Sequence, residues 1–164
     1  MPTAKEVADQ LVALCQKGKN IEAVEKLFSA DAVSVEAMGD ETMPAVMTGR
    51  AAIRGKNEWW FQNHSVHSAS LRGPFPNGER FAAIYDFEVT AKAGPMAGQR
   101  MRMEEVALYT VADGKIVREE FFYDMAGASN LPVSKPKKAT SRKPKKKAKA
   151  RPAARKAKVK KRRR

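Results

Sequence analysis

Hydrophobic residues recur every three or four positions in the first part of the chain, which predicts helices. Val7 and Leu11 follow this spacing between a Thr3–Glu6 capping box and a stop signal at Gly18. The next segments predict a second helix over residues 20–28, a strand over 31–36, a loop over 37–48 and a longer helix over 49–63. The first half of the chain is therefore expected to be mainly helical.

The hydrophobic period changes to two after residue 64, which predicts strands. Alternating segments lie at residues 65–71, 80–92, 100–112 and 115–124, separated by turn clusters at 73–78 and 94–98 and by Asp113–Gly114. Helices followed by hairpin-linked strands are typical of an α+β domain, in which helices cover one face of an antiparallel sheet.

Charge divides the chain into two regions. The 164 residues carry a formal charge of +14, but all 18 acidic residues lie between Glu6 and Asp124. Residues 1–133 contain 14 basic residues and so carry −4, whereas residues 134–164 contain 18 basic residues and no acidic one. We therefore predict a folded domain over 1–130 and a disordered tail, rich in Lys, Arg, Pro and Ala, over 131–164.

The folded region resembles the SnoaL-like proteins of the nuclear transport factor 2-like superfamily. The resemblance covers about residues 3–126 and rests on the order of elements and on the segments 27–33, 48–54 and 109–124. It implies a cystatin-like fold, in which a cone-shaped, curved antiparallel β-sheet wraps around a long helix. It also implies a ligand cavity at the wide mouth and a homodimer formed through the outer sheet face. The superfamily includes isomerases, cyclases, dehydratases and binding proteins, so the fold leaves the activity open.

Chemistry in such a cavity would require a carboxylate whose pKa is raised by apolar surroundings. The catalytic candidates are His64, Tyr85, Glu104 and Glu120, and the candidate pocket residues are Trp60, Phe87, Met103, Phe122 and Asp124. Strand alternation separates Glu104 from Glu105 and Glu119 from Glu120, but it does not decide which face lines the cavity. Cross-strand ion pairs would explain these glutamates equally well. His64 could also cap the end of the long helix.

Several kinds of site are not expected. His64 and His67 straddle a predicted helix end without an obvious third ligand, so no metal site is predicted, and no phosphate-binding loop or cofactor motif is present. The single cysteine, Cys15, is expected to be a small buried hydrophobic residue. No apolar run is long enough to span a bilayer, and no signal peptide is visible. We expect a cytoplasmic protein, nucleoid-associated, or nuclear in a eukaryote.

The tail contains two imperfect repeats, 134–138 and 141–147, and resembles the lysine-rich tails of linker histones. A segment of this composition would bind nucleic acid through phosphates, without sequence preference. The residues assigned to this contact are Lys137, Lys138, Arg142, Lys143, Lys145, Lys146 and Lys147. An anionic membrane surface, an acidic protein and no dedicated partner remain alternatives.

These observations favour a SnoaL-like domain that binds a small apolar or aromatic molecule and is tethered to nucleic acid by its tail. One alternative is a cofactor-independent isomerase, cyclase or dehydratase that uses a pocket carboxylate or histidine. The other is a dimerisation module that presents two basic tails and so increases avidity.

Overall fold

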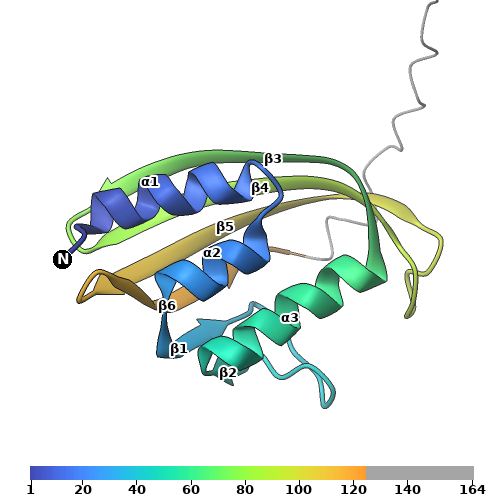
Figure 1. Cartoon of the computed structure of the whole chain (residues 1–164). Helices are drawn as coiled ribbons and strands as arrows, with labels where there is room; N and C mark the ends of the chain where they lie inside the picture. Colours follow the sequence, from blue (N-terminus) through green and yellow to red (C-terminus); the bar gives the residue numbers. More distant parts are fainter. Residues whose placement is uncertain (125–164) are drawn as a thin grey trace, which may run out of the picture. The chain divides into compact units, whose positions relative to one another are not determined.

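The structure, a computed structural model, describes residues 1–124. Its elements are α1 (Ala4–Cys15), α2 (Asn20–Leu27), β1 (Phe28–Val35), β2 (Val46–Thr48), α3 (Arg50–Asn63), β3 (His64–Asn77), β4 (Arg80–Ala91), β5 (Arg100–Ala112) and β6 (Lys115–Phe122) (Figure 1). This order confirms the predicted α+β class. The predicted tail and its nucleic-acid contacts, Lys137, Lys138, Arg142, Lys143, Lys145, Lys146 and Lys147, lie outside the described residues.

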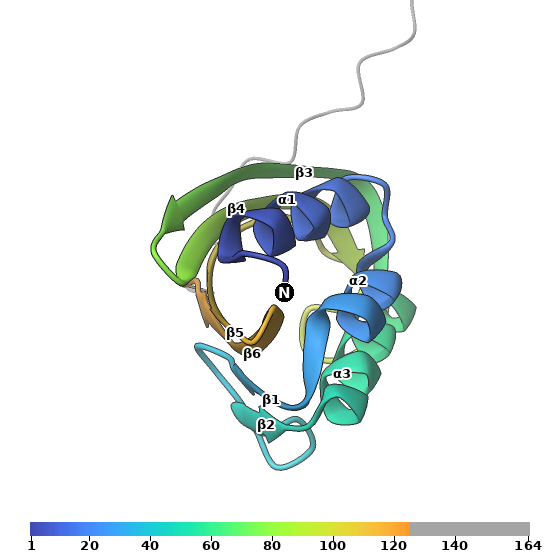
Figure 2. The ribbon, with the colours of Figure 1, turned by 60° about the vertical axis from the view of Figure 1, so that its left-hand side comes forward.

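Six strands form one sheet in the order β2-β1-β6-β5-β4-β3. Neighbouring strands are antiparallel except β1 and β6, which run parallel. The sheet is strongly curved, and Figure 2 shows the strands bending round from β3 through β5 and β6 to β1. The predicted curved sheet is therefore confirmed, and its concave side is the place where side chains from distant parts of the chain can meet.

Helix α1 lies along the concave side of the sheet (Figure 1). Its start is fixed by the predicted capping box, in which the Glu6 amide donates to Thr3 Oγ1 and the Glu6 carboxylate accepts from the Thr3 amide. Val7 and Leu11, one helical turn apart, are buried against the strands. The capping box and the apolar stripe therefore set both the start of the helix and the face that it buries.

The main core lies between the helices and the concave sheet face. Its largest fully buried side chains include Phe28 of β1, Phe81 of β4 and Tyr109 of β5, and the last two rings stack with centroids 4.8 Å apart. Ile53 of α3 is also fully buried. Aromatic packing of this kind keeps neighbouring strands and the helix layer in fixed positions, which gives the concave surface a defined shape.

The structure differs from the sequence prediction at three edges. Residues 46–48, expected to lie in a loop, form β2 and pair with β1. Strand β3 continues through the predicted turn to Asn77, because register shifts near Gly73 bend the strand without ending its pairing with β4. Strand β6 ends at Phe122 rather than at Asp124.

Candidate active site on the concave sheet face

Alternation along β5 decides which glutamate faces the interior. Ala107 and Tyr109 are buried on the concave side, so Glu105 and Met103, which share their parity, face the same way. Glu104 faces outward. The open question of strand face is thereby settled for β5.

A β-bulge changes the alternation on β6. Val111 pairs with Ile116, but Thr110 pairs with Arg118, so Val117 is an extra residue on this strand. As a result both Ile116 and Glu119 are buried on the concave side. A simple period of two would place these two residues on opposite faces.

The structure corrects the prediction that Glu104 and Glu120 line the cavity. Glu104 is 57% exposed and forms an ion pair of 3.0 Å with Arg72, and Glu120 forms one of 3.1 Å with Arg118. Both carboxylates lie on the outer face, since their strand positions have outward parity. The alternative interpretation of these two glutamates as ion-pair partners is the one that the contacts support.

Two predicted pocket residues also lie away from the concave side. Phe122 is 54% exposed on the outer face of β6, and Asp124 is exposed beyond the end of the strand. Both positions follow from the bulge in β6 and from the early end of that strand. Trp60, Phe87 and Met103, in contrast, pack together around a small apolar cluster on the concave side.

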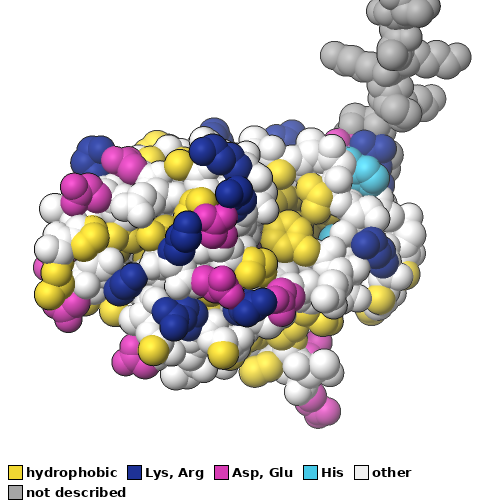
Figure 3. Space-filling view, in the orientation of Figure 1, with side chains coloured by type: hydrophobic (Ala, Val, Ile, Leu, Met, Phe, Trp, Pro, Cys, Tyr) yellow, Lys and Arg dark blue, Asp and Glu magenta, His cyan; other side chains and the backbone are white. Residues whose placement is uncertain are grey.

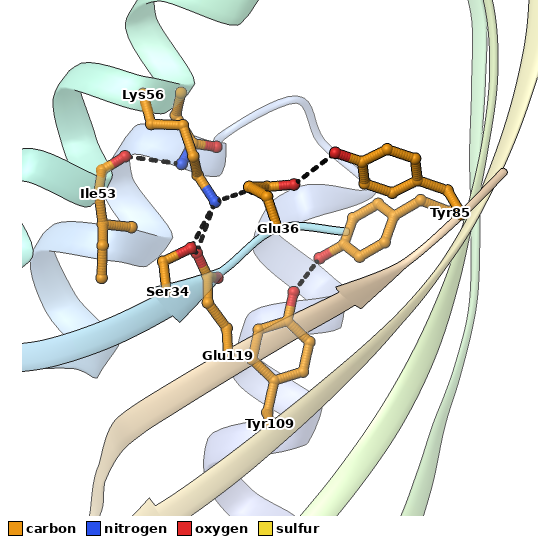
Figure 4. Close-up of polar contacts among 9 residues, drawn as sticks. Ser34, Glu36, Ile53, Lys56, Tyr85, Tyr109 and Glu119 are labelled. Atoms are coloured by element: carbon orange, nitrogen blue, oxygen red, sulfur yellow. Dashed lines mark hydrogen bonds and ion pairs between the residues drawn. The ribbon is translucent and has the colours of Figure 1, made fainter. Parts of the chain in front are cut away.

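A buried ionic cluster joins α3, β1 and β6. The Lys56 ammonium donates to Glu36 Oε1 at 2.6 Å, to Ser34 Oγ at 2.7 Å and to Glu119 Oε1 at 2.9 Å (Figure 4). Ser34 Oγ donates in turn to Glu119 Oε1 at 2.7 Å. The ammonium also lies 4.4 Å from the centroid of the Phe121 ring. The cluster is therefore a compact set of charge-assisted hydrogen bonds.

Lys56 stays protonated in this cluster. Burial disfavours its ammonium form, but attraction and hydrogen bonding from Glu119 and Glu36 outweigh that effect and raise the pKa of Lys56 above its usual value. A protonated lysine cannot remove the proton of Ser34. The short Lys56–Ser34 contact is therefore structural and does not activate the serine as a nucleophile.

Glu105 lies next to this cluster but, unlike Glu36 and Glu119, is not bonded to Lys56. No hydrogen bond or ion pair identified within residues 1–124 involves its side chain. Burial, with smaller contributions from the negative charges of Glu36 and Glu119, raises the pKa of Glu105 to about 7, against the opposing effect of Lys56. A carboxyl group with this pKa can both release and accept a proton near neutral pH.

Two tyrosines share a hydrogen bond beside Glu105. Tyr85 lies directly across the β4–β5 ladder from Glu105. The hydroxyl oxygens of Tyr85 and Tyr109 are 2.9 Å apart (Figure 4). Tyr85 also donates to Cys15 Sγ at 3.8 Å. Burial raises the pKa of both tyrosines well above the usual value, so both remain neutral. The predicted candidate Tyr85 therefore lies in the site as a buried, hydrogen-bonded phenol.

An aromatic wall extends from Tyr85 to the end of α3. Ring centroids are 5.9 Å apart for Tyr85 and Phe87, 4.9 Å for Phe87 and Trp60, and 4.7 Å for Trp60 and His64. His64 Nδ1–H donates to the Trp60 carbonyl oxygen at 2.9 Å, which caps the helix. Figure 3 shows hydrophobic side chains in a hollow between the α1–α2 pair and the C-terminal half of α3. These rings together offer an apolar surface for an organic molecule.

Residues 1–124 contain neither a group of metal ligands nor a helix able to span a membrane. His67 Nε2 bonds Thr90 Oγ1 at 2.8 Å, whereas His64 bonds the end of α3, so the two imidazoles do not form a joint site. Within residues 1–124 no three His, Cys, Asp or Glu side chains are grouped to hold a metal ion. None of the helices described is long and apolar enough to cross a bilayer.

Five groups near the centre of this site, Ser34, Glu36, Lys56, Glu105 and Glu119, are not among the sequence candidates. A usable signal existed for Glu105, since it shares strand parity with Met103, Ala107 and Tyr109, the more apolar set on β5. Lys56 carried no comparable signal because its partners come from strands far away in the sequence.

Comparison with known proteins assigns the chain to a family. The profile of the SnoaL-like domain matches residues 2–123. A candidate SnoaL-like polyketide cyclase from Mesorhizobium loti, whose description also carries the name carbohydrate phosphatase, is 43% identical. The alignment covers 74% of this chain and all of that one, with a TM-score of 0.69.

More distant structures share the fold. A protein of unknown function with a cystatin-like fold from Xanthomonas campestris is 17% identical, with a TM-score of 0.60 over 78% of this chain and 95% of its own. A candidate polyketide cyclase from Pseudomonas putida is 20% identical, with a TM-score of 0.58 over 77% of this chain and 95% of its own. A search of curated proteins found no match. Because the profile covers most of the chain, this protein belongs to the SnoaL-like domain family.

Proposed function

We propose that this domain is a cofactor-independent proton-transfer enzyme of the isomerase, cyclase or dehydratase type, with Glu105 as its acid–base group. The observation that carries the proposal is a concave-face carboxyl group without a partner among the described residues, with a pKa of about 7. The aromatic wall beside it would hold a small apolar or aromatic substrate. The name of the 43% identical relative, a candidate polyketide cyclase, supports the same class of chemistry.

Glu105 transfers the proton, and the neighbouring ion pairs of Lys56 have a structural role. The Glu105 carboxylate takes a proton from a carbon next to a carbonyl group and returns it at a second position or to an oxygen that leaves. One residue can serve in both steps because both protonation states are populated near neutral pH. The ion pairs of Lys56 with Glu36 and Glu119 join α3 to the end of β1 and to β6 near Glu105.

The test is the exchange of carbon-bound protons in D₂O. Wild-type protein is incubated with aromatic ketones and β-keto esters, and the loss of α-proton signals is followed by NMR. We expect at least one probe to exchange roughly 10²-fold faster than in buffer, and Glu105→Gln to lose that acceleration. Glu104→Gln is the matched control, since Glu104 is on the same strand but on the outer face. Equal acceleration by Glu105→Gln and wild type would refute the role of Glu105. If no probe were accelerated, the proposal of an enzyme would be refuted in favour of a ligand-binding domain.

The outer sheet face supports a second proposal, that two copies pair through it. Val106 and Phe122 are in register on β5 and β6 and remain 38% and 54% exposed. Apolar side chains of this size on an open sheet face favour a partner with the same surface. Sedimentation velocity tests this idea: Phe122→Glu should shift the protein to monomer, and an unchanged sedimentation coefficient would rule it out.

The basic segment supports the proposed tether to nucleic acid. Residues 134–164 carry 18 basic residues and no acidic one. Binding through phosphates should weaken steeply as salt rises. We expect a chain ending at Val133 to lose retention on a double-stranded DNA column, whereas the full chain is retained at low salt. Retention of the shortened chain would assign the contact to the domain instead.

A further inference from the structure

The concave site contains more negative than positive charge. Among the residues that the structure describes, three carboxyl groups, Glu36, Glu105 and Glu119, influence one another there, and the ammonium between them is that of Lys56. We infer that the ligand of this site carries a positive charge and is an organic amine in its ammonium form. The inference rests on the proposed function and names its substrate class.

The hydrogen-bonding capacity of Lys56 is already used. An ammonium group has three N–H donors, and those of Lys56 have three acceptors at 2.6–2.9 Å: Glu36, Ser34 and Glu119. None is left for Glu105. The excess carboxyl group must therefore hold a proton of its own or take a cation from outside the described residues, because an isolated buried carboxylate is costly.

The contacts of Lys56 show that carboxylates and an aromatic ring on the concave side already hold one ammonium group. The Lys56 ammonium is held by two carboxylates and lies 4.4 Å from the Phe121 ring centroid. Glu105 repeats half of this arrangement: it faces Tyr85 across the ladder, and the Tyr85 ring stacks on Phe87. A carboxylate beside an aromatic wall is thus present a second time, with no cation bonded to it from residues 1–124.

An ammonium ligand would complete this second arrangement. Its charge would pair with the Glu105 carboxylate, and its hydrocarbon part would lie on the wall formed by Phe87 and Trp60. Pairing with the ammonium lowers the pKa of Glu105, so the carboxyl group of the complex is in the form that accepts a proton. An anionic ligand would meet three carboxyl groups and is disfavoured.

The experiment compares three probes of similar size and different charge on the full chain. Benzylammonium, benzyl alcohol and benzoate are titrated at neutral pH, and binding is measured by calorimetry and by shifts in the protein NMR spectrum. We expect benzylammonium to bind at least roughly tenfold more tightly than benzyl alcohol, and benzoate not to bind. Equal affinities, binding of benzoate, or no binding by any probe would overturn the inference.

Two variants place the selectivity at Glu105. Glu105→Gln should bring the affinity for benzylammonium down to that for benzyl alcohol, whereas Glu104→Gln, which removes a carboxylate on the outer face, should leave the tenfold preference intact. An unchanged preference in Glu105→Gln would contradict the assignment. The comparison of probes on unmodified protein stands even if a variant does not fold. Proton exchange without ammonium preference would refute only this inference, and preference without exchange only the proposed function.

Discussion

The Lys56 ammonium lies 2.9 Å from the Glu119 carboxylate, and this contact joins the middle of α3 to β6. The two side chains are only 11% and 4% exposed, although 63 positions separate them in the sequence. Glu36, from the segment after β1, completes the pair from a third direction. The position of α3 over the concave face therefore depends on a buried charge arrangement as well as on apolar packing.

Removing this ammonium should strongly destabilise the domain. Lys56→Met leaves Glu36 and Glu119 without their cation in a nearly water-free place, and breaking a buried pair in this way costs about 3–5 kcal/mol. Urea unfolding of the variant measures the loss. Arg54→Met is the matched control on the same helix, because Arg54 is 48% exposed and its surface ion pairs contribute less than about 1 kcal/mol each.

The same mechanism predicts a partial rescue. Lys56→Met combined with Glu119→Gln removes one of the two stranded charges, so the double variant should be more stable than Lys56→Met alone. If the double variant were less stable than the single one, hydrogen-bond geometry rather than charge would dominate the cluster.

Glu105 should make the domain less stable as pH rises through the range where it ionises. Its pKa is raised from 4.5 to about 7, so the folded chain binds its proton more tightly than the unfolded chain does. Between these pH values the free energy of unfolding of the wild type therefore falls with pH. We expect Glu105→Gln to lack this component and to gain up to about 3 kcal/mol over wild type by pH 7.

Urea unfolding at a series of pH values checks this prediction. The control is Glu104→Gln, whose exposed ion pair with Arg72 should change the free energy of unfolding by less than about 1 kcal/mol at any pH. Parallel pH profiles for wild type and Glu105→Gln would mean that Glu105 is not buried in the way described.

The Cys15 thiol should react slowly in the folded protein. Burial raises its pKa to about 11 from 9.0, against the opposing effect of the hydrogen bond from Tyr85. Because the thiolate is the reactive form, alkylation by iodoacetamide at mildly alkaline pH should be about 100-fold slower than in the unfolded chain. Mass spectrometry follows the reaction, with denatured protein as the control, and equal rates in both states would contradict the prediction.

Neighbouring charges should move the pKa of Glu105 in opposite directions. Glu36→Gln removes a negative charge that raises this pKa, so the pKa should fall below about 7. Lys56→Met removes the positive charge that opposes the rise, so the pKa should increase. Carboxyl ¹³C NMR titrations of both variants test the signs, and a shift in the same direction for both would exclude this electrostatic account.

The local pattern of apolar and polar residues predicted most of the fold, because the periodicity of a helix or strand is visible within one contiguous segment. The capping box at Thr3 and the alternation on β4 and β5 are of this kind. Strand β2 was missed because three residues carry no measurable period and become a strand only by pairing with β1. The curvature of the sheet, expected from the family resemblance, is not visible in any single segment.

The site was harder to predict because it depends on register and on long-range contacts. One extra residue, Val117, moves Glu119 rather than Glu120 onto the same face as Ile116. Lys56 looks like an ordinary helix-surface lysine until α3 packs against β1 and β6. Trp60 and Phe87, predicted as pocket residues, pack against a small apolar cluster, but whether they contact a ligand stays a prediction.

The central claim is that Glu105 is a concave-face carboxyl group able to exchange a proton near neutral pH. A ¹³C NMR titration of side-chain carboxyl signals in wild-type protein, with Glu105→Gln used to assign the Glu105 signal, measures this directly. The structure predicts a titration midpoint of about 7. A midpoint near the ordinary value of 4.5 would contradict the account, because Glu105 would then be a solvated side chain with no special chemistry.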